Sequence, residues 1–292
     1  MSQLYRVVHT TRYRYSEPVS GAHNESRLVP RETDRQRCTA RRVTITPTPR
    51  AYRERTDFFG NPTAYFAIQE PHEELTVTVT SRVSLGAAVD TDVDEPWHVV
   101  QERLMTDPDL AGREARPFVL ESRLVRPTAE MHDYATESFV PGRPLLEAAH
   151  ELTHRIHGDF AYEQGITTVA TPLADVLRNR RGVCQDFAHV AVGCIRSIGL
   201  PARYVSGYIE TAPPPGQKKL VGADASHAWF SIWTPHAGWV DFDPTNDQRV
   251  GDHHVTLSWG RDFADVTPLK GVVFGTGTHE LDVSVDVRRV AN

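Results

Sequence analysis

Residue types that together can break an amide bond follow one another in the second half of the sequence. Cys184 stands where a polar, glycine-containing segment gives way to an apolar helical pattern. His227 and two aspartates, Asp241 and Asp243, follow in strand-like segments. A thiol beside a general base, with the base oriented by a carboxylate, can carry out nucleophilic catalysis. The sequence therefore predicts acyl transfer through a cysteine.

Cys184 is the best candidate nucleophile among the three cysteines. The thiolate is the reactive form, and the unpaired N–H groups and aligned dipoles of a helix N-terminus favour it. With a histidine nearby, such a position can lower a thiol pKa to roughly 3.5–7.5. Cys194 lies on the apolar face of the same predicted helix, so we expect a small buried hydrophobe. For Cys38, in a β-rich region, we expect a structural role.

His227 is the best placed of the fourteen histidines to serve as the base. It opens a strand of bulky alternating residues after a polar stretch, a junction that can both anchor and expose it. Trp229, two positions further, would share its strand face and shield the imidazole from water. His189 follows Cys184 by five positions, about 140° around the helix. We expect His189 to be a packed or surface residue instead.

The carboxylate that would orient His227 is ambiguous by pattern alone. Asp241 and Asp243 are two positions apart, so they share one face of a predicted strand. Pro244 ends that strand, which places Asp243 at its rim. The alternation of side chains between the two strand faces therefore does not show which of the two aspartates would orient His227.

No metal or cofactor is expected. The neighbouring His253 and His254 point to opposite faces of an extended chain, so they are poorly placed to bind one ion. The sequence lacks the His-Glu-x-x-His and clustered Cys-x-x-Cys motifs, the P-loop, the dinucleotide-binding glycines and the Gly-x-Ser-x-Gly elbow. An odd number of widely spaced cysteines also fits a reducing compartment better than a disulfide framework.

Composition favours a globular protein, while the candidate chemistry of Cys184 makes a peptide or amide-containing substrate the expected partner. The 292 residues are 39% hydrophobic and 24% charged, with a net charge of −6. No basic run suggests a nucleic-acid partner. No signal-like apolar segment and no stretch of eighteen apolar residues is present, so we expect a cytoplasmic protein without a membrane partner. The sequence gives no indication of oligomeric state.

The predicted organisation is a β-rich N-terminal domain over 1–95, a connector over 96–140, a catalytic core over 141–250 and C-terminal strands over 251–292. Period-two patterns at 43–46 and 75–80 predict a small sandwich or open barrel of antiparallel strands. The connector is expected to carry short helices near 99–104 and 120–124. The C-terminal strands would complete the core or pack on the N-terminal domain.

The core is predicted to be α+β. Apolar residues at helical spacing predict helices over 144–157, 171–181 and 184–198. Strands are predicted over 202–209, 228–233, 238–243 and 281–287, with an exposed loop at 213–216.

These core motifs resemble those of the bacterial transglutaminase-like superfamily. The likeness rests on Gly-Val-Cys-Gln-Asp-Phe-Ala-His at 182–189, the run from Arg196 to Tyr208, Ser-His-Ala-Trp at 226–229 and Trp-Val-Asp-Phe-Asp-Pro-Thr at 239–245. It extends over roughly 140–250. The stretch around Asp-Phe-Phe-Gly-Asn at 57–61 is similar to the β-rich region that precedes the core in one bacterial branch.

The resemblance implies a papain-like core with Cys184 at the start of a central helix, packed on an antiparallel sheet that carries His227 and Asp243. It thereby selects Asp243 over Asp241. Family members include amide-crosslinking enzymes, peptidases, glycopeptide amidases and proteins that have lost part of the triad. All three positions are filled in this sequence, so we expect an active enzyme.

The expected function is a thiol hydrolase of amide or peptide bonds with a Cys184–His227–Asp243 triad. The oxyanion would meet the Cys184 backbone N–H and a second donor. Candidates for that donor, or for substrate contact, are Gln185, Tyr162 and Trp229. The alternatives are an amine acyltransferase of the transglutaminase type and a non-catalytic binding protein on the same fold.

Overall fold

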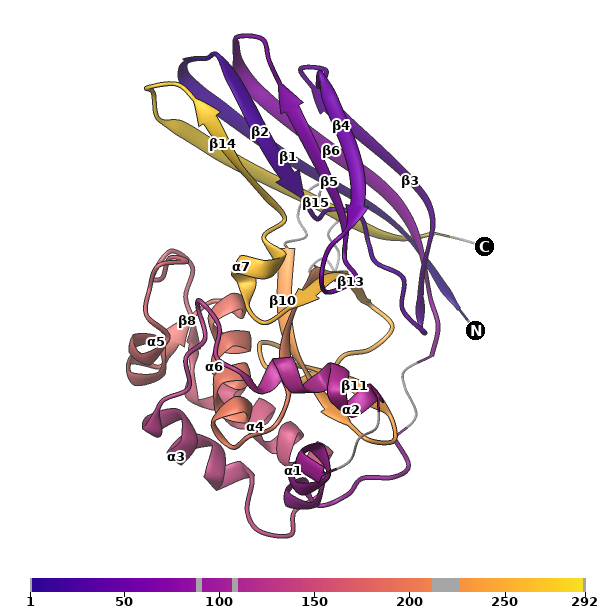
Figure 1. The fold of residues 1–292 in the computed structure, drawn as a ribbon, viewed down its shortest axis with the longest axis vertical. Helices are drawn as coiled ribbons and strands as arrows, with labels where there is room; N and C mark the ends of the chain where they lie inside the picture. The colour runs from indigo at the N-terminus through magenta and orange to yellow at the C-terminus, as the bar shows by residue number, and fades with distance from the viewer. Residues whose placement is uncertain (1, 88–90, 107–109, 212–225, 291–292) are drawn as a thin grey trace, which may run out of the picture.

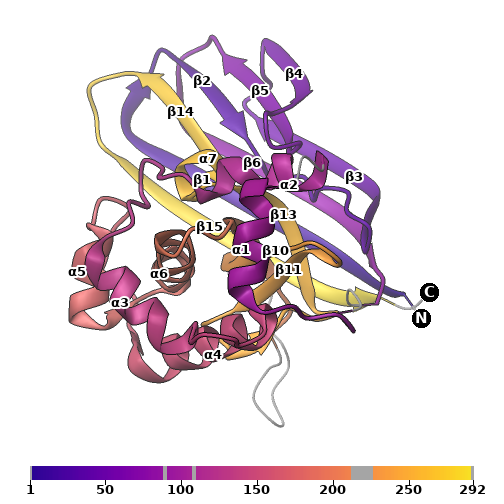
Figure 2. The ribbon, with the colours of Figure 1, turned by 60° about the horizontal axis from the view of Figure 1, so that its bottom comes forward.

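The computed structural model describes residues 2–87, 91–106, 110–211 and 226–290, and the predicted loop at 213–216 lies outside them. Figure 1 shows two parts, one built of strands and one in which helices surround a further sheet. Both chain ends lie beside each other at one end of the strand-built part (Figures 1 and 2). Among the described helices, none combines the length and the apolar character needed to span a membrane.

The strand-built part consists of two antiparallel sheets that face each other. One has the order β15-β1-β6-β3, with bounds His279–Val290, Gln3–Val19, His72–Leu85 and Gln36–Thr46. The other has the order β14-β2-β5-β4, with bounds Leu269–Phe274, Gly21–Ser26, Pro62–Ile68 and Ala51–Thr56. Alternate apolar residues such as Phe66 and Leu75 fill the space between them, which is why the period-two segments became strands. The sequence-predicted strands at 43–46, 75–80 and 281–287 are confirmed.

The second part is built on an antiparallel sheet with the order β12-β11-β10-β9-β13. Their bounds are Gln248–Arg249, Gly238–Asp243, Ser226–Thr234, Ala202–Ile209 and His254–Gly260. Helix α6 (Cys184–Ser197) packs on β9 and β10, and Figure 2 shows it end-on with other helices around it. Its apolar face, Phe187, Val190 and Cys194 among others, is buried against Phe230 and Ile232 of β10. This helix-on-sheet core confirms the α+β prediction.

The remaining helices form the outer layer of this part. They are α1 (Trp97–Thr106), α2 (Leu110–Ala115), the 3₁₀ helix η1 (Arg116–Val119), α3 (Ala129–Ser138), α4 (Leu145–Asp159), α5 (Leu173–Asn179) and α7 (Phe263–Val266). Two short strands, β7 (Ala161–Tyr162) and β8 (Arg181–Gly182), pair in parallel just before α6.

The connector contains the main departures from the predicted elements. The expected helix at 120–124 is wrong: η1 ends before it, and the Leu124 N–H donates to the Asp262 carboxylate, a contact far away in sequence. Helix α3, which was not predicted, begins where the Thr128 hydroxyl accepts a hydrogen bond from the Met131 N–H. Its buried residues, Met131 and Tyr134 among them, pack into the core around α6, so tertiary contacts stabilise it.

The two parts share an apolar contact. Tyr5 of β1 and Val83 of β6 pack with Tyr208 of β9 and Val255 of β13, all fully buried. The C-terminal segment serves both parts, since β13 completes the core sheet while β14 and β15 are edge strands of the two facing sheets. The sheet that carries His227 and Asp243 therefore packs against α6 and also against the strand-built part.

Candidate active site

Cys184 is the first residue of α6, and the loop before it is fixed by the side chain of Asp186. The Asp186 carboxylate accepts hydrogen bonds from the Val183 N–H (2.8 Å) and the Thr167 hydroxyl (2.6 Å). A Cβ on Gly182 would lie 2.6 Å from this carboxylate, so the loop requires glycine at that position. Because the first N–H groups of a helix have no intrahelical acceptor, the Cys184 N–H can serve a ligand. The half-buried thiol thus lies at the helix N-terminus, where the Asp186 and Phe187 N–H groups already donate to the Val183 carbonyl.

The structure brings the side chains of His227 and Asp243 into contact. His227 lies at the start of β10 and Asp243 at the end of β11, and His227 Nε2 is 2.7 Å from Asp243 Oδ2. Cys184 packs against the small cluster that contains Ala228, the residue next to His227, and its side chain is one cause of the raised His227 pKa. Since Nε2 faces Asp243, the imidazole presents Nδ1 to the sulfur. The three side chains therefore form a connected row of thiol, imidazole and carboxylate.

The surroundings favour a charged imidazole and a charged carboxylate. Burial by itself would lower the pKa of His227, but the hydrogen bonds and charges of Asp243 and Cys184 outweigh it and raise this pKa to about 10. Burial would likewise raise the pKa of Asp243, yet hydrogen bonds from His227 and His254 hold it well below its usual range. The pair is suited to orient an imidazolium that gives its proton to a leaving group.

Sequence reasoning missed two residues that support Asp243. His254 Nε2 lies 3.1 Å from Asp243 Oδ2, and the side-chain amide of Asn246 donates to the same oxygen at 2.7 Å. His254 is fully buried, and burial lowers its pKa, so the neutral ring donates through Nε2. The expectation that His253 and His254 point to opposite faces is wrong: His253 lies in the turn before β13, and its ring centroid is 4.5 Å from that of His254. The only signal in the sequence was the placement of a histidine in a strand that would pair beside the site.

The candidates for the second oxyanion donor lie in different surroundings. Tyr162 is 51% exposed, and burial of part of its ring together with the charge of Cys184 raises its pKa. Gln185 is partly buried in the first turn of α6. Trp229 is completely buried, with its ring centroid 6.1 Å from that of His227, and forms a wall behind the imidazole. The exposed Tyr162 is the better placed of the three to reach a substrate.

Other residues weighed from the sequence lie apart from the triad. Cys194 is fully buried, and burial raises its pKa to about 12, as expected of a core thiol. His189 is buried, and burial lowers its pKa to about 4; its Nε2 accepts from the Phe263 N–H. Asp241 shares the strand face of Asp243 but lies opposite Ser231 and close to Arg203, so it belongs to another group of side chains.

Two family models match the chain. The model of the bacterial transglutaminase-like N-terminal region matches residues 5–84, and that of the transglutaminase-like superfamily matches residues 133–244. An uncharacterized protein of Mycobacterium tuberculosis is 42% identical over 293 residues, covering 97% of this chain and 92% of the relative.

Two further comparisons concern the fold and the core. The crystal structure of a candidate cysteine protease from Cytophaga hutchinsonii superposes with a TM-score of 0.78 at 21% identity, covering 100% of this chain and 92% of its own. The likeness shows a common fold. A protein-glutamine gamma-glutamyltransferase of Pseudomonas aeruginosa is 37% identical over 92 residues, which are 30% of this chain and 14% of that protein.

Proposed function

Because the chain belongs to the transglutaminase-like superfamily, we propose that it is a cysteine-dependent hydrolase of amide bonds. One observation carries the proposal. The thiol at the start of α6 lies beside His227, and His227 is hydrogen-bonded to the buried Asp243 carboxylate at 2.7 Å. A nucleophile, a proton carrier and an orienting group in contact are the parts that thiol acyl transfer needs.

The proposed reaction has two steps. The Cys184 sulfur attacks the amide carbonyl carbon. The developing oxyanion accepts hydrogen bonds from the Cys184 N–H and from the Tyr162 hydroxyl, the best placed of the candidate second donors. The C–N bond then breaks as His227 Nδ1 gives its proton to the leaving amine, which leaves a thioester. In the second step water attacks the thioester carbonyl carbon and gives a proton to His227, the C–S bond breaks, and the carboxylic acid departs with the Cys184 thiolate and the His227 imidazolium restored.

A second candidate is transfer of the acyl group to an amine instead of water. It is favoured by the similarity of 92 residues of the chain to a protein-glutamine gamma-glutamyltransferase of Pseudomonas aeruginosa. The chemistry up to the thioester is the same, and the two functions differ in which nucleophile reaches the thioester carbon.

The test begins with the thiol. Limiting iodoacetamide at pH 6, followed by peptide mass spectrometry, should label Cys184 far faster than Cys38 or the buried Cys194. His227→Ala should slow labelling of Cys184 without changing that of Cys38. Labelling of Cys184 at the rate of an ordinary thiol would contradict an activated nucleophile and favour a non-catalytic protein.

Turnover then separates hydrolysis from transfer. The wild-type protein is incubated with a library of glutamine-containing peptides, with and without methylamine, and products are read by mass. New carboxylic acids support hydrolysis, and methylamides formed at their expense support transfer. Cys184→Ala should abolish both while the circular dichroism spectrum is retained. Amidase activity that is retained in Cys184→Ala would contradict the proposed mechanism.

A further inference from the structure

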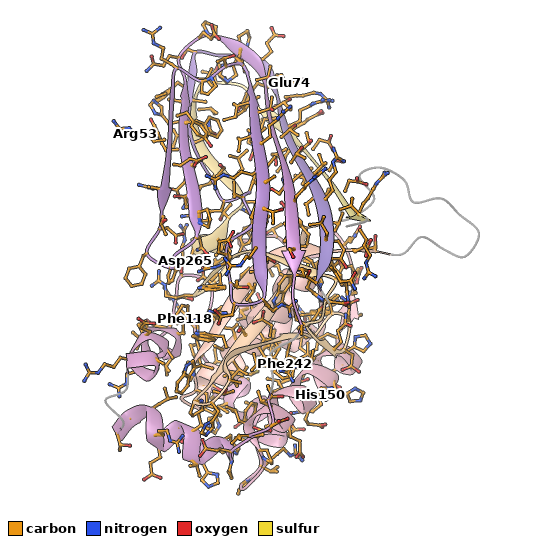
Figure 3. All side chains as sticks on the ribbon, turned by 90° about the vertical axis from the view of Figure 1, so that its right-hand side faces the viewer. Arg53, Glu74, Phe118, His150, Phe242 and Asp265 are labelled. Atoms are coloured by element: carbon orange, nitrogen blue, oxygen red, sulfur yellow. The ribbon has the colours of Figure 1, made fainter. Side chains whose placement is uncertain are left out.

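A large cavity lies between the two parts of the molecule, away from the triad. Its volume is about 1040 Å³, within the upper range of small-molecule sites. Segments 31–35 and 58–60 of the strand-built part line one side, and residues of β9, β11 and β13 line the other. Phe118, another lining residue, is labelled in Figure 3 at the level where the strands meet the helical part.

Arg203 of β9 lines this cavity without a polar partner. It is 5% exposed, and no hydrogen bond or ion pair joins its guanidinium to the part of the chain that the structure describes. Its Nε is among the buried atoms that lack a hydrogen-bond partner. Burying an unpaired guanidinium is costly, because no protein acceptor replaces the water it loses. The side chain is held instead between two rings, 4.4 Å from the Trp239 centroid and 3.6 Å from that of Trp259.

Another buried arginine of the same chain shows what a structural guanidinium looks like here. Arg196 of α6 is 3% exposed and donates to the carbonyl oxygens of Ala202 and Arg261 and to the Ser122 hydroxyl. The chain thus satisfies the buried guanidinium of Arg196 and leaves that of Arg203 open toward the cavity.

Arg203 belongs to a polar row across the core sheet. Arg203 lies opposite Ser231 of β10, and Ser231 lies opposite Asp241 of β11, so the three side chains share one face of the sheet. Arg203 Nε, Ser231 Oγ and Asp241 Oδ1 are each buried without a hydrogen-bond partner. Arg203 and Asp241 lie near enough for their charges to interact, yet no ion pair joins them. An unused donor and an unused acceptor therefore face the same space.

Arg31 is a second cation that lines the same cavity. Arg31 is 7% exposed, lies 3.0 Å from the Trp259 ring centroid and has a buried Nε without a partner. The charges of Arg31 and Arg203 repel each other, which lowers the pKa of Arg31 in addition to the larger effect of burial. Arg31 Nη1 donates to the Phe59 carbonyl and to Asn61 Oδ1, so its Nε is the donor without a partner, and an anion beside both guanidinium groups would offset their repulsion.

This polar row is separate from the catalytic residues. An apolar cluster of Val205, Trp229 and Val250, with Trp259 against it, lies on the same face of the sheet. Trp229 contacts His227 on the catalytic side. None of Cys184, His227 and Asp243 lines the cavity.

We propose that this cavity is a binding site for a small zwitterionic ligand of amino-acid or dipeptide type. Its carboxylate binds the guanidinium groups of Arg203 and Arg31, and its amino group donates to Asp241. Stacked Trp239 and Trp259 hold Arg203 in place for the carboxylate. The site is independent of the proposed hydrolase activity and would be occupied whether or not Cys184 turns over a substrate.

Isothermal titration calorimetry on the full chain carrying Cys184→Ala tests the proposal without turnover. The probes are glycylglycine, acetate, ethylammonium and inorganic phosphate. We expect saturable binding of glycylglycine, weaker binding of acetate and none of ethylammonium. Arg203→Met, which keeps the length of the side chain, should weaken glycylglycine binding by about tenfold or more. Asp241→Asn should weaken glycylglycine binding and leave acetate binding unchanged.

Thermal unfolding without ligand provides the matched control. Arg203→Met should match or exceed the parent in Tm because it removes an unpaired buried charge, whereas Arg196→Met should lower Tm by leaving three acceptors unpaired. Arg203→Lys keeps a charge and should retain part of the binding. Glycylglycine binding that is absent from the parent, or equal in Arg203→Met, overturns the site. Phosphate binding that exceeds glycylglycine binding and is indifferent to Asp241→Asn overturns the zwitterionic assignment.

Discussion

At the scale of the residue, Asp243 organises the site. Its Oδ2 accepts from His227, His254 and Asn246, and its Oδ1 accepts from the Thr245 and Asn246 N–H groups at 3.0 and 3.3 Å. A carboxylate so fully satisfied stays ionised and immobile. The orientation and the charge of His227 therefore both depend on Asp243.

Replacing Asp243 by Asn should lower the pKa of His227 from about 10, because the imidazolium loses its charged acceptor. We expect kcat/KM to fall by at least ~10²-fold, since a correctly oriented acid and base contributes that much or more. NMR titration of the His227 ring and steady-state kinetics measure the two effects. Asp175→Asn removes an exposed acidic charge of α5 and should change neither. An unchanged His227 titration in Asp243→Asn would contradict the role given to this carboxylate.

The same pair makes a pH-dependent contribution to stability. The raised pKa of His227 stabilises the folded state fully below its unfolded value of about 6.5, and this contribution is lost as the pH rises toward 10. The lowered pKa of Asp243 stabilises the folded state above about 3.9, and this contribution is lost as the pH falls. The difference in unfolding free energy between wild type and Asp243→Asn should thus be largest near pH 4–6.5. Urea titrations across pH 3–10 measure it, and a pH-independent difference would refute the linkage.

At the scale of the element, the start of α6 determines where the sulfur lies. Asp186→Ala removes the acceptor of the Val183 N–H and the Thr167 hydroxyl, and should cost about 0.5–2 kcal/mol of stability, as helix N-caps do. It should also lower kcat, because the loop that fixes Cys184 is released. Thr128→Ala, which removes the cap of α3, should cost a similar amount with kcat unchanged. Equal kcat values in the two variants would show that the Asp186 cap does not position the thiol.

The elements also show how far the sequence could be read. Helix α6 was predictable because Phe187, Val190 and Cys194 keep a helical period around a buried face. Residues 120–124 have an apolar pattern too, but the Leu124 N–H donates to the Asp262 carboxylate instead of to a helical carbonyl. Because Asp262 is so far along the chain, the local sequence could not predict this hydrogen bond. Cys184 and His227 could be proposed because each stands in a local motif, whereas the strand pattern left Asp241 and Asp243 open and only the family resemblance selected Asp243. His254 and Asn246 could not be predicted, since only strand pairing and the turn after β11 bring them to Asp243.

At the scale of the whole molecule, the C-terminal strands β14 and β15 each form an edge strand of one of the two facing sheets. A chain that stops after residue 268 loses β14 and β15 and with them the buried Leu269, Val285 and Val287. Full burial of such side chains contributes about 1.5–3 kcal/mol each, a large part of the 5–15 kcal/mol typical of folded proteins. We expect a lower Tm, a broadened transition and increased binding of a hydrophobic dye.

The matched control keeps both strands and changes their exposed faces. Val272 of β14 is 62% exposed and Val283 of β15 is 45% exposed, so Val272→Ser with Val283→Ser should unfold close to wild type. A truncated chain that unfolds with the wild-type Tm would show that the two edge strands contribute little.

The pairing of the first and last strands has a mechanical consequence. β1 and β15 run antiparallel from Leu4 opposite Val290 to Tyr15 opposite His279, so both ends of the chain leave the molecule at the same point (Figure 1). Tension applied between the ends would load this ladder at its terminal rung and break its hydrogen bonds one pair after another, as in unzipping. The chain would then yield to pulling at low force, beginning with β15, and this first step would leave α6, which carries Cys184, in place.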